Sequence, residues 1–180
     1  MKLNAQELRT TLVDFEVAKS IKKNPITIIL DNVLDTYNIG SIFRLADAVA
    51  AEKVYLCGST ETPPNTRIKK ASINTWQWVE WQYLPTASEA IAQCKMSNAK
   101  CQIVAVEQDE KSIPFQTMKY SFPIAIVVGN ETNGIAKEVL KVVDTIIELP
   151  MFGINTSLNV MVTTGIILYD ILRQLRSIGD

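Results

Sequence analysis

Hydrophobic positions along the chain follow two alternating patterns, one typical of buried strands and one typical of helices. Short runs of β-branched and other apolar residues, such as 26–30, are bounded by polar and turn-forming residues and predict strands. Segments such as 39–50 repeat apolar residues at the spacing of an amphipathic helix. The expected strands are 26–30, 54–57, 102–106, 124–128 and 145–149, and the expected helices are 39–50, 87–96, 135–140 and 157–176.

The order of these elements predicts an α/β fold with a mostly parallel sheet and helices on both faces. A length of 180 residues suits a single domain over 1–180. The main part of this domain is expected over 26–176, preceded by a helical extension over 1–24. In that extension apolar side chains recur at helical spacing: Leu3, Leu8, Leu12, Phe15 and Ala18.

The stretch 58–75 departs from this alternation and is expected to be a long loop. It is polar and rich in turn-forming residues, and Arg67, Lys69 and Lys70 cluster within it. Long loops in compact domains are often functional. Two interpretations stay open, a basic patch that binds an anionic partner and an ordinary solvated connection.

The composition excludes several kinds of catalyst, because the chain has no histidine. Ser-His-Asp and Cys-His nucleophiles and His-containing zinc sites are ruled out, so any proton transfer must use a carboxylate, Lys, Tyr, Cys, Arg or water. The net charge of −1 and the pI of about 5.6 do not indicate nucleic-acid binding by the chain as a whole. A local patch on such a protein can still contact phosphates.

The sequence also predicts where the protein works. No apolar run approaches the roughly 18 residues of a membrane span, and the first residues lack the apolar stretch of a signal peptide. Cys57, Cys94 and Cys101 are an odd and scattered set, which favours a reducing compartment. We expect a cytoplasmic protein with no membrane partner.

Candidate chemistry lies in three segments, 31–44, 127–135 and 149–160, each of which follows an apolar strand and is rich in Gly, Asn or Ser. Ligands of open α/β sheets bind beyond the carboxyl ends of the strands. None of the three contains GxGxxG or GxxxxGK[ST], so an NAD enzyme or an NTPase is not expected.

The first segment predicts an anion site. Asn38 is expected to cap the helix that follows, and Gly40 is expected to let a ligand approach its first turn. Arg44 can hold a phosphate through two parallel hydrogen bonds. The alternative is an ordinary surface pair between Arg44 and Asp47.

In the second segment Gly129 is expected to leave its backbone open to a ligand, and Glu131 is the only carboxylate of the turn. The alternative is a plain turn in which Asn133 and Gly134 adopt positive φ angles.

In the third segment, Ser157 is expected to cap the last helix. Asn159 is expected to be buried, because the residues after it are apolar nearly all round, and a buried amide must find partners.

Taken together, these segments resemble the signature motifs of the SpoU (TrmH-type) branch of the SPOUT RNA methyltransferases, over residues 26–176. The motifs are NxGxxxR (Asn38, Gly40, Arg44), GNExxG (Gly129, Asn130, Glu131, Gly134) and PMxGxxxSLNV (Pro150, Met151, Gly153, Ser157, Leu158, Asn159, Val160).

The resemblance implies a fold, a cofactor and a reaction. The C-terminal part of the domain would form a deep trefoil knot, a rare exception to unknotted topology. S-adenosylmethionine, with no metal, would lie in the knot loops and donate a methyl group to a ribose 2′-hydroxyl of tRNA or rRNA. The implied cofactor-binding residues are Gly129, Leu149 and Leu158, with Ser157 nearby and Val106 at a strand end.

The resemblance also implies roles for individual side chains. Arg44 would be the catalytic arginine, acting with a substrate phosphate, and Asn38, Glu131 and Asn159 would support it. RNA contacts would fall to Arg67, Lys69 and Lys70, and the protein would be a homodimer that buries part of its apolar last helix. Two alternatives stay open: a catalytically inactive module that binds S-adenosylmethionine or RNA, and a base methyltransferase of another SPOUT branch.

Overall fold

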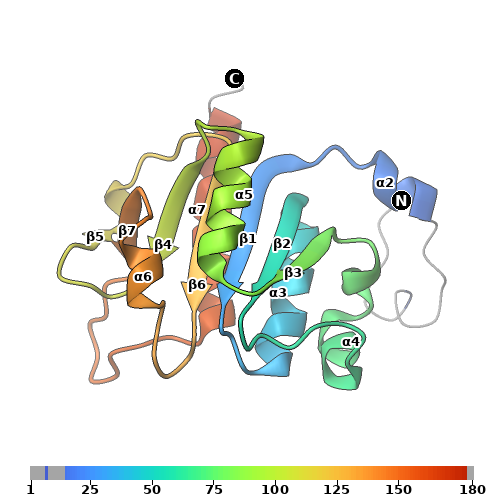
Figure 1. Ribbon diagram of the computed structural model, residues 1–180, viewed down its shortest axis with the longest axis horizontal. Coiled ribbons are helices and arrows are strands. Elements are labelled where there is room, and N and C mark those ends of the chain that lie inside the picture. Colours follow the sequence, from blue (N-terminus) through green and yellow to red (C-terminus); the bar gives the residue numbers. More distant parts are fainter. Residues whose placement is uncertain (1–6, 8–14, 178–180) are drawn as a thin grey trace.

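The computed structural model describes residues 7 and 15–177 and shows one seven-stranded sheet (Figure 1). The strand order is β3-β2-β1-β6-β4-β7-β5, and every pairing between these strands is parallel. The α/β class with a parallel sheet, predicted from the sequence, is confirmed. The strands are β1 (Asn24–Asp31), β2 (Ala51–Cys57), β3 (Trp81–Leu84), β4 (Gln102–Val106), β5 (Ile113–Pro114), β6 (Ile124–Gly129) and β7 (Thr145–Glu148).

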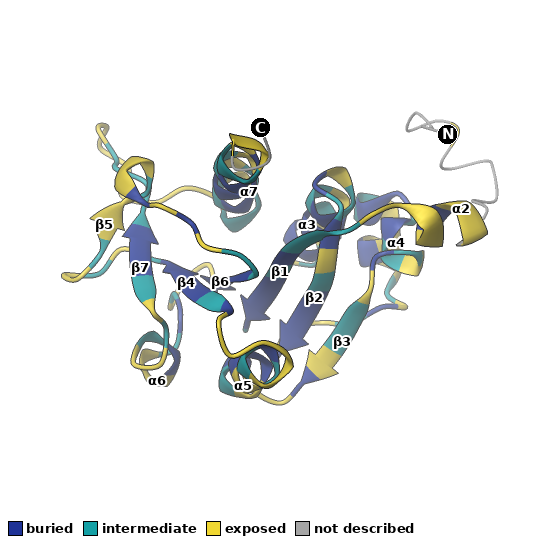
Figure 2. Ribbon diagram, turned by 90° about the horizontal axis from the view of Figure 1, so that it is seen from above, coloured by how far each residue is buried: buried dark blue, intermediate teal, exposed yellow. Residues whose placement is uncertain are grey.

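Helices cover both faces of the sheet. Helices α3, α4 and α7 lie on one face, and α5 and α6 lie on the other (Figure 2). The helices are α2 (Phe15–Ser20), α3 (Thr36–Ala48), α4 (Thr66–Ser72), α5 (Ala87–Ser97), α6 (Lys137–Leu140) and α7 (Val160–Ser177), with short 3₁₀ turns at Thr75–Gln77 and Phe115–Thr117. None of the helices in the part of the chain described is long and apolar enough to cross a membrane.

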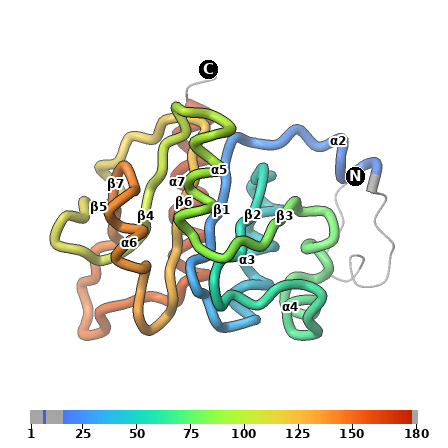
Figure 3. Tube along the Cα trace, viewed as in Figure 1, coloured from blue at the N-terminus to red at the C-terminus, as the bar shows by residue number. Residues whose placement is uncertain are grey.

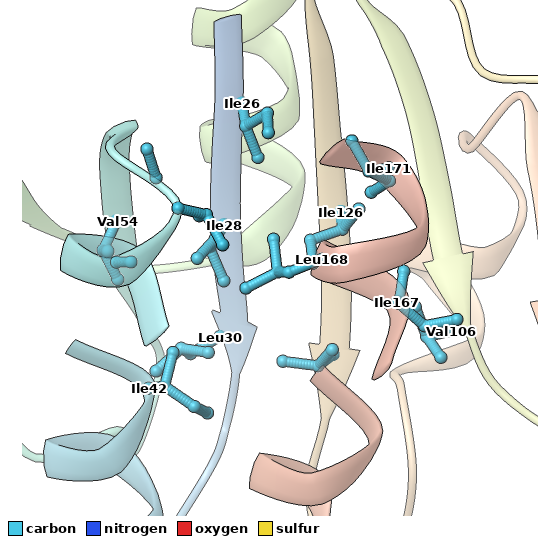
Figure 4. Close-up of a cluster of buried hydrophobic side chains, with 14 of the residues drawn as sticks. Ile26, Ile28, Leu30, Ile42, Val54, Val106, Ile126, Ile167, Leu168 and Ile171 are labelled. Carbon is cyan, nitrogen blue, oxygen red and sulfur yellow. The ribbon is translucent and has the colours of Figure 1, made fainter. Parts of the chain in front are cut away.

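Successive side chains of β1 point to opposite faces of the sheet and therefore belong to two separate core clusters. Ile26, Ile28 and Leu30 pack with residues of α3 and α7 in one cluster (Figure 4), whereas Ile29 packs with residues of α5 in the other. All of these side chains are fully buried. Burial of an isoleucine or leucine side chain contributes about 1.5–3 kcal/mol, so the central strand anchors both layers.

The sequence missed three elements. Strands β3 and β5 are short edge strands whose side chains are mostly exposed or half-buried, so they lack the apolar run of a central strand. The stretch 58–75 is not a continuous loop, because it contains α4. Asn65 caps this helix by accepting hydrogen bonds from the backbone N–H groups of Arg67 and Ile68.

Two predicted helix starts are also wrong. Asp35, not Asn38, caps α3, since its carboxylate accepts a hydrogen bond from the backbone N–H of Tyr37 at 2.8 Å. Helix α7 begins at Val160, and Asn159 takes the capping role expected of Ser157. In the N-terminal extension Phe15 and Ala18 lie in α2, and the predicted helical positions 3, 8 and 12 fall outside the described residues.

Candidate functional site

The three candidate segments meet at the carboxyl ends of the strands, along the lower edge of the view in Figure 3. The second and third segments line a cavity of about 570 Å³, which lies within the usual size range of small-molecule sites, and the first segment adjoins it through hydrogen bonds from Leu34, Asp35 and Asn38 to Glu131. Every residue implied to bind the cofactor lines this cavity, although β4, β6, the position after β7 and the loop before α7 supply them separately. They are Val106, Gly129, Leu149, Ser157 and Leu158.

The charge of this cavity is negative. Glu107, Glu131 and Glu148 line it, and its lining contains no lysine or arginine. The Glu107 carboxylate accepts hydrogen bonds from the backbone N–H groups of Ile135 and Gln108, at 2.8 and 3.0 Å. Such a lining suits a ligand that carries positive charge.

The turn after β6 folds back tightly on itself. Asn130 and Gly134 exchange two backbone hydrogen bonds, at 3.1 and 2.9 Å. A Cβ added at Gly129 would lie 2.5 Å from the backbone carbon of Gly134 and 2.5 Å from the backbone nitrogen of Ile135. Glycine is therefore required at 129 by the turn itself, in addition to any ligand contact. Gly134 has a positive φ of 66°, as expected, whereas Asn133 does not have one.

Glu131 joins this turn to the start of α3. Its carboxylate accepts hydrogen bonds from the backbone N–H groups of Leu34 and Asp35, at 3.2 and 3.3 Å, and from the side-chain amide of Asn38 at 3.0 Å. The Asn38 carbonyl oxygen in turn accepts a hydrogen bond from the side-chain amide of Asn159 at 3.0 Å. One residue from each of the three motifs thus belongs to a single network.

The network changes the acidity of Glu131. Partial burial by itself would raise the pKa of this carboxyl, but hydrogen bonds from the Asn38 amide and from backbone N–H groups, including those of Leu34 and Asp35, outweigh it and lower the pKa. Glu131 is consequently a fixed negative charge and a hydrogen-bond acceptor at neutral pH.

Asn159 differs from its expected environment. It was expected to be buried, but it is exposed, because it lies at the end of the loop that leads into α7 and not within the helix. It still has hydrogen-bond partners: its amide group donates to Asn38, and its carbonyl oxygen accepts from the backbone N–H groups of Met161 and Val162.

Arg44 lies on the outer face of α3. It is exposed, and its side chain has no hydrogen bond or ion pair with any residue that the structure describes. The alternative pairing with Asp47 is not seen, since Asp47 instead accepts a hydrogen bond from the indole N–H of Trp78 at 2.7 Å. Arg44 is six residues beyond Asn38, or about 9 Å along the helix axis.

Helix α4 brings the basic residues beside α3. Arg67, Lys69 and Lys70 are all exposed on it. A Cβ at Gly40 would lie 2.6 Å from the Cβ of Ala71 and 2.8 Å from the carbonyl oxygen of Ile68. Gly40 is therefore buried under α4 and does not admit a ligand, so this expectation is wrong.

Sequence reasoning missed several polar residues that hold the site. Asp31 is buried, and its carboxylate accepts a hydrogen bond from the backbone N–H of Ala136 at 2.9 Å. The side chain of Asn130 donates to the carbonyl oxygen of Asn32 at 2.9 Å. Glu107 lines the cavity directly. An acidic residue immediately after an apolar strand, as at 31 and 107, was the available signal.

Metal ligands are not clustered in the described part of the chain: no group of three or more Cys, Asp or Glu residues there is arranged to hold an ion.

Comparisons with known proteins all lead to one group. The family model described as the SpoU rRNA Methylase family matches residues 25–169. A curated relative from Aquifex aeolicus, named tRNA (guanosine(18)-2′-O)-methyltransferase, is 32% identical over 162 residues, covering 88% of this chain and 74% of the relative. The protein of the same name from Escherichia coli strain K12 is 31% identical, covering 86% of this chain and 66% of that protein.

Solved structures show the same likeness. The crystal structure of the A. aeolicus TrmH/SpoU tRNA modifying enzyme superposes with a TM-score of 0.79 at 31% identity, covering 97% of this chain and 84% of that one. The S-adenosylmethionine-bound rRNA methyltransferase of Sinorhizobium meliloti gives a TM-score of 0.77 at 28% identity, covering 88% of this chain and 60% of that one. This chain therefore spans about two thirds of the length of several of its relatives.

Proposed function

Because the chain belongs to the SpoU rRNA methylase family, we propose that it transfers a methyl group from S-adenosylmethionine to a ribose 2′-hydroxyl of tRNA or rRNA. Curated relatives carry 2′-O-methyltransferase names, and a related structure contains the cofactor. The observation that carries the proposal is the hydrogen-bonded network of Glu131, Asn38 and Asn159 between the acidic cavity and the α3 helix that carries Arg44.

The cavity suits this cofactor. Its lining is acidic, and the cofactor carries a sulfonium and an ammonium group. Gly129, Leu149 and Leu158 offer backbone groups to it, with Ser157 and Val106 beside them. When bound, the cofactor supplies an electrophilic methyl group and leaves as S-adenosylhomocysteine.

Arg44 acts on the RNA. Its unpaired guanidinium holds a phosphate of the substrate at two points and so orients the neighbouring ribose. A phosphate oxygen held in this way accepts the proton of the 2′-hydroxyl while the ribose 2′-oxygen forms the bond to the methyl group. Asn38, Glu131 and Asn159 keep the start of α3 fixed and present polar groups to the ribose. This chemistry needs no histidine and no metal.

The exposed cationic side chains of α4 extend the proposed RNA-binding surface of the protein. Arg67, Lys69 and Lys70 lie on the same face of the sheet as Arg44 and contact the RNA, Lys69 and Lys70 through further phosphates. The overall charge of −1 is compatible with this local patch.

The protein acts as a homodimer in this proposal. On α7, Val162, Ile166 and Tyr169 are exposed at helical spacing, and Phe152 and Ile154 are almost wholly exposed in the loop before the helix. A stable dimer interface buries about 2,000 Å² or more, and these side chains supply its apolar part. Light scattering at micromolar concentration should give twice the mass of the 20.1 kDa chain, and a monomer with full activity would contradict the assembly.

The remaining features follow the family pattern. We propose that residues 1–180 form one domain of a cytoplasmic protein, with the catalytic part over 26–176 and the N-terminal extension over 1–24, and that the C-terminal part of the domain forms a deep trefoil knot.

The function is tested with the purified chain, S-adenosylmethionine labelled in its methyl group, and pooled unmodified tRNA and rRNA. After digestion to nucleosides, the label should be found on ribose. Label on a base would indicate another SPOUT branch, and cofactor binding without transfer would indicate an inactive module.

The role of Arg44 in this reaction is tested with the variant Arg44→Ala. The kcat should fall by about a hundredfold or more, and Arg44→Lys should do nearly as badly because it loses two-point contact with phosphate. Cofactor affinity and Tm should not change. Lys100→Ala removes an exposed cation in the turn between α5 and β4, away from the proposed site and interface, and serves as the control. Normal turnover of Arg44→Ala would make this mechanism wrong.

A further inference from the structure

A second cavity lies next to the first. It has a volume of about 370 Å³ and is formed by the loop after β1, the start of α3 and the residues before and at the start of α4. Its lining residues are Leu34, Asp35, Thr36, Tyr37, Glu61, Asn65, Thr66 and Arg67. The two cavities share a wall: Glu131 lines the first, and its carboxylate binds the backbone N–H groups of Leu34 and Asp35, which line the second.

Three side chains of this cavity are not used by the fold. Tyr37 is 51% exposed, and neither its hydroxyl nor the side chains of Glu61 and Arg67 form a hydrogen bond or ion pair with any residue within the described ranges. By contrast, Asp35 and Asn65 are occupied as helix caps. The cavity therefore offers one aromatic ring, one free carboxylate and one free guanidinium.

The charges of the lining disfavour a phosphate in this cavity. Asp35 and Glu61 are opposed only by Arg67, so the lining carries one more negative than positive charge. A neutral group that donates hydrogen bonds is not repelled. Nucleobases are neutral, and an exposed aromatic side chain is the usual surface on which an unstacked RNA base stacks.

Among the four bases, guanine has the edge that matches these groups. A carboxylate only accepts hydrogen bonds and a guanidinium only donates them. Guanine presents two adjacent donors, N1–H and the N2 amino group, next to the acceptor O6. Adenine, cytosine and uracil do not place two adjacent donors on this edge, so they would leave Glu61 incompletely paired.

We propose that the second cavity binds the guanine base of the nucleotide to be methylated, stacked on Tyr37 and hydrogen-bonded to Glu61 and Arg67. The inference rests on the proposed function, because the shared wall at Glu131 then places the ribose of that nucleotide between the base and the methyl donor. Tyr37 and Arg44 are seven residues apart on α3 and share its exposed face, so base and phosphate are held by one helix.

A binding experiment tests the cavity independently of catalysis. The full chain is saturated with S-adenosylhomocysteine, and the affinities of GMP, AMP, CMP, UMP and ribose 5-phosphate are measured by equilibrium dialysis. GMP should bind at least about tenfold more tightly than the other four, the discrimination expected of one two-point contact. Tyr37→Ala should abolish this binding, Tyr37→Phe should keep it, and Glu61→Gln should remove the preference for GMP.

Controls and contrary results separate the two proposals. Glu80→Gln changes an exposed carboxylate outside the cavity and should have no effect. Equal binding of all four nucleotides, or equal binding of ribose 5-phosphate, would overturn the guanine site and leave the methyltransferase proposal intact.

In the methyl-transfer assay, wild type should yield mainly 2′-O-methylguanosine, and Tyr37→Ala should raise the KM for RNA without changing cofactor affinity. Transfer mainly to pyrimidine nucleotides would overturn the inference. Selective GMP binding without any methyl transfer would support the cavity and count against the proposed function.

Discussion

The turn 129–135 and the loop 150–159 border the same cavity, but they are held in different ways. In the turn, backbone groups bind one another, and the side chain of Glu131 binds the two residues before α3 and Asn38 within it. In the loop, Phe152 is 95% exposed and Ile154 is fully exposed. The hydrogen bonds that hold this loop among the described residues are few, such as that from Gln108 to the carbonyl oxygen of Thr156 at 2.6 Å.

Because of this difference, the turn and the loop have different roles in the site. The turn builds the polar network from residues of one chain, so the groups proposed to face the ribose are fixed before any ligand arrives. The loop leaves apolar side chains in solvent, a state that is unfavourable unless another surface covers them. We expect cofactor and partner subunit to order the loop, whereas the turn contacts the cofactor with a conformation that is already fixed and should change little when it binds.

The sharpest test of this contrast replaces one glycine in each region. Gly129→Ala should destabilise the fold by about 3 kcal/mol, because its Cβ would meet backbone atoms at 2.5 Å that cannot move aside. In a chain of this length that is a fall in Tm of roughly 6–12 °C. Gly153→Ala has nothing within 4 Å of the new Cβ and should change Tm little. Equal effects in calorimetry would remove the contrast.

Ligand binding should change the dynamics of the loop far more than those of the turn. S-adenosylhomocysteine at a hundred times its Kd should stabilise the protein by about 2.7 kcal/mol. Hydrogen exchange measured by mass spectrometry should slow strongly in peptides covering 150–159 and only slightly in peptides covering 129–135. Protection of the turn to the same degree would show that both regions are completed by the ligand.

Replacing one asparagine of the network and one of the loop by alanine is a second comparison, with a smaller expected effect on stability. Asn38→Ala removes hydrogen bonds to Glu131 and Asn159 and should cost about 1–3 kcal/mol in urea unfolding. Asn155→Ala loses only a local bond, from the backbone N–H of Ser157 at 3.2 Å, and should cost less than about 0.5 kcal/mol. A larger loss for Asn155 would reverse the assignment of the rigid region.

The pH dependence of stability is the smallest effect. Because the pKa of Glu131 is lower in the folded protein than its ordinary value of 4.5, the charged form stabilises the fold above that pH. This contribution should disappear as the pH falls through the folded pKa. The difference in Tm between wild type and Glu131→Gln, measured from pH 7 to pH 3, should shrink in acid. A constant difference would mean that charge on Glu131 is not involved.

The sequence located the central strands and the three polar segments well, and for a clear reason. Runs such as 26–30 and 124–128 are buried on both faces, so nearly every position in them is apolar. Helix starts were less accurate: Asn38 and Ser157 were assigned as caps, whereas Asp35 and Asn159 cap the helices. Neighbouring Asp, Asn and Ser residues are all good caps, and propensity alone does not choose between them.

What the sequence determined by itself is therefore the set of chemical groups: no histidine, one arginine six residues after Asn38, one carboxylate in the 129–134 turn, and asparagine before the last apolar helix. The tertiary structure decided which of them meet. Asn38 and Glu131 are 93 residues apart, and Asn38 and Asn159 are 121 residues apart, so no local pattern contains their contacts. The same holds for Gly40, whose small size is explained only by the backbone of α4 that crosses it. These distant groups meet because parallel pairing of β1 with β6, and of β6 with β4, aligns the carboxyl ends of strands at one edge.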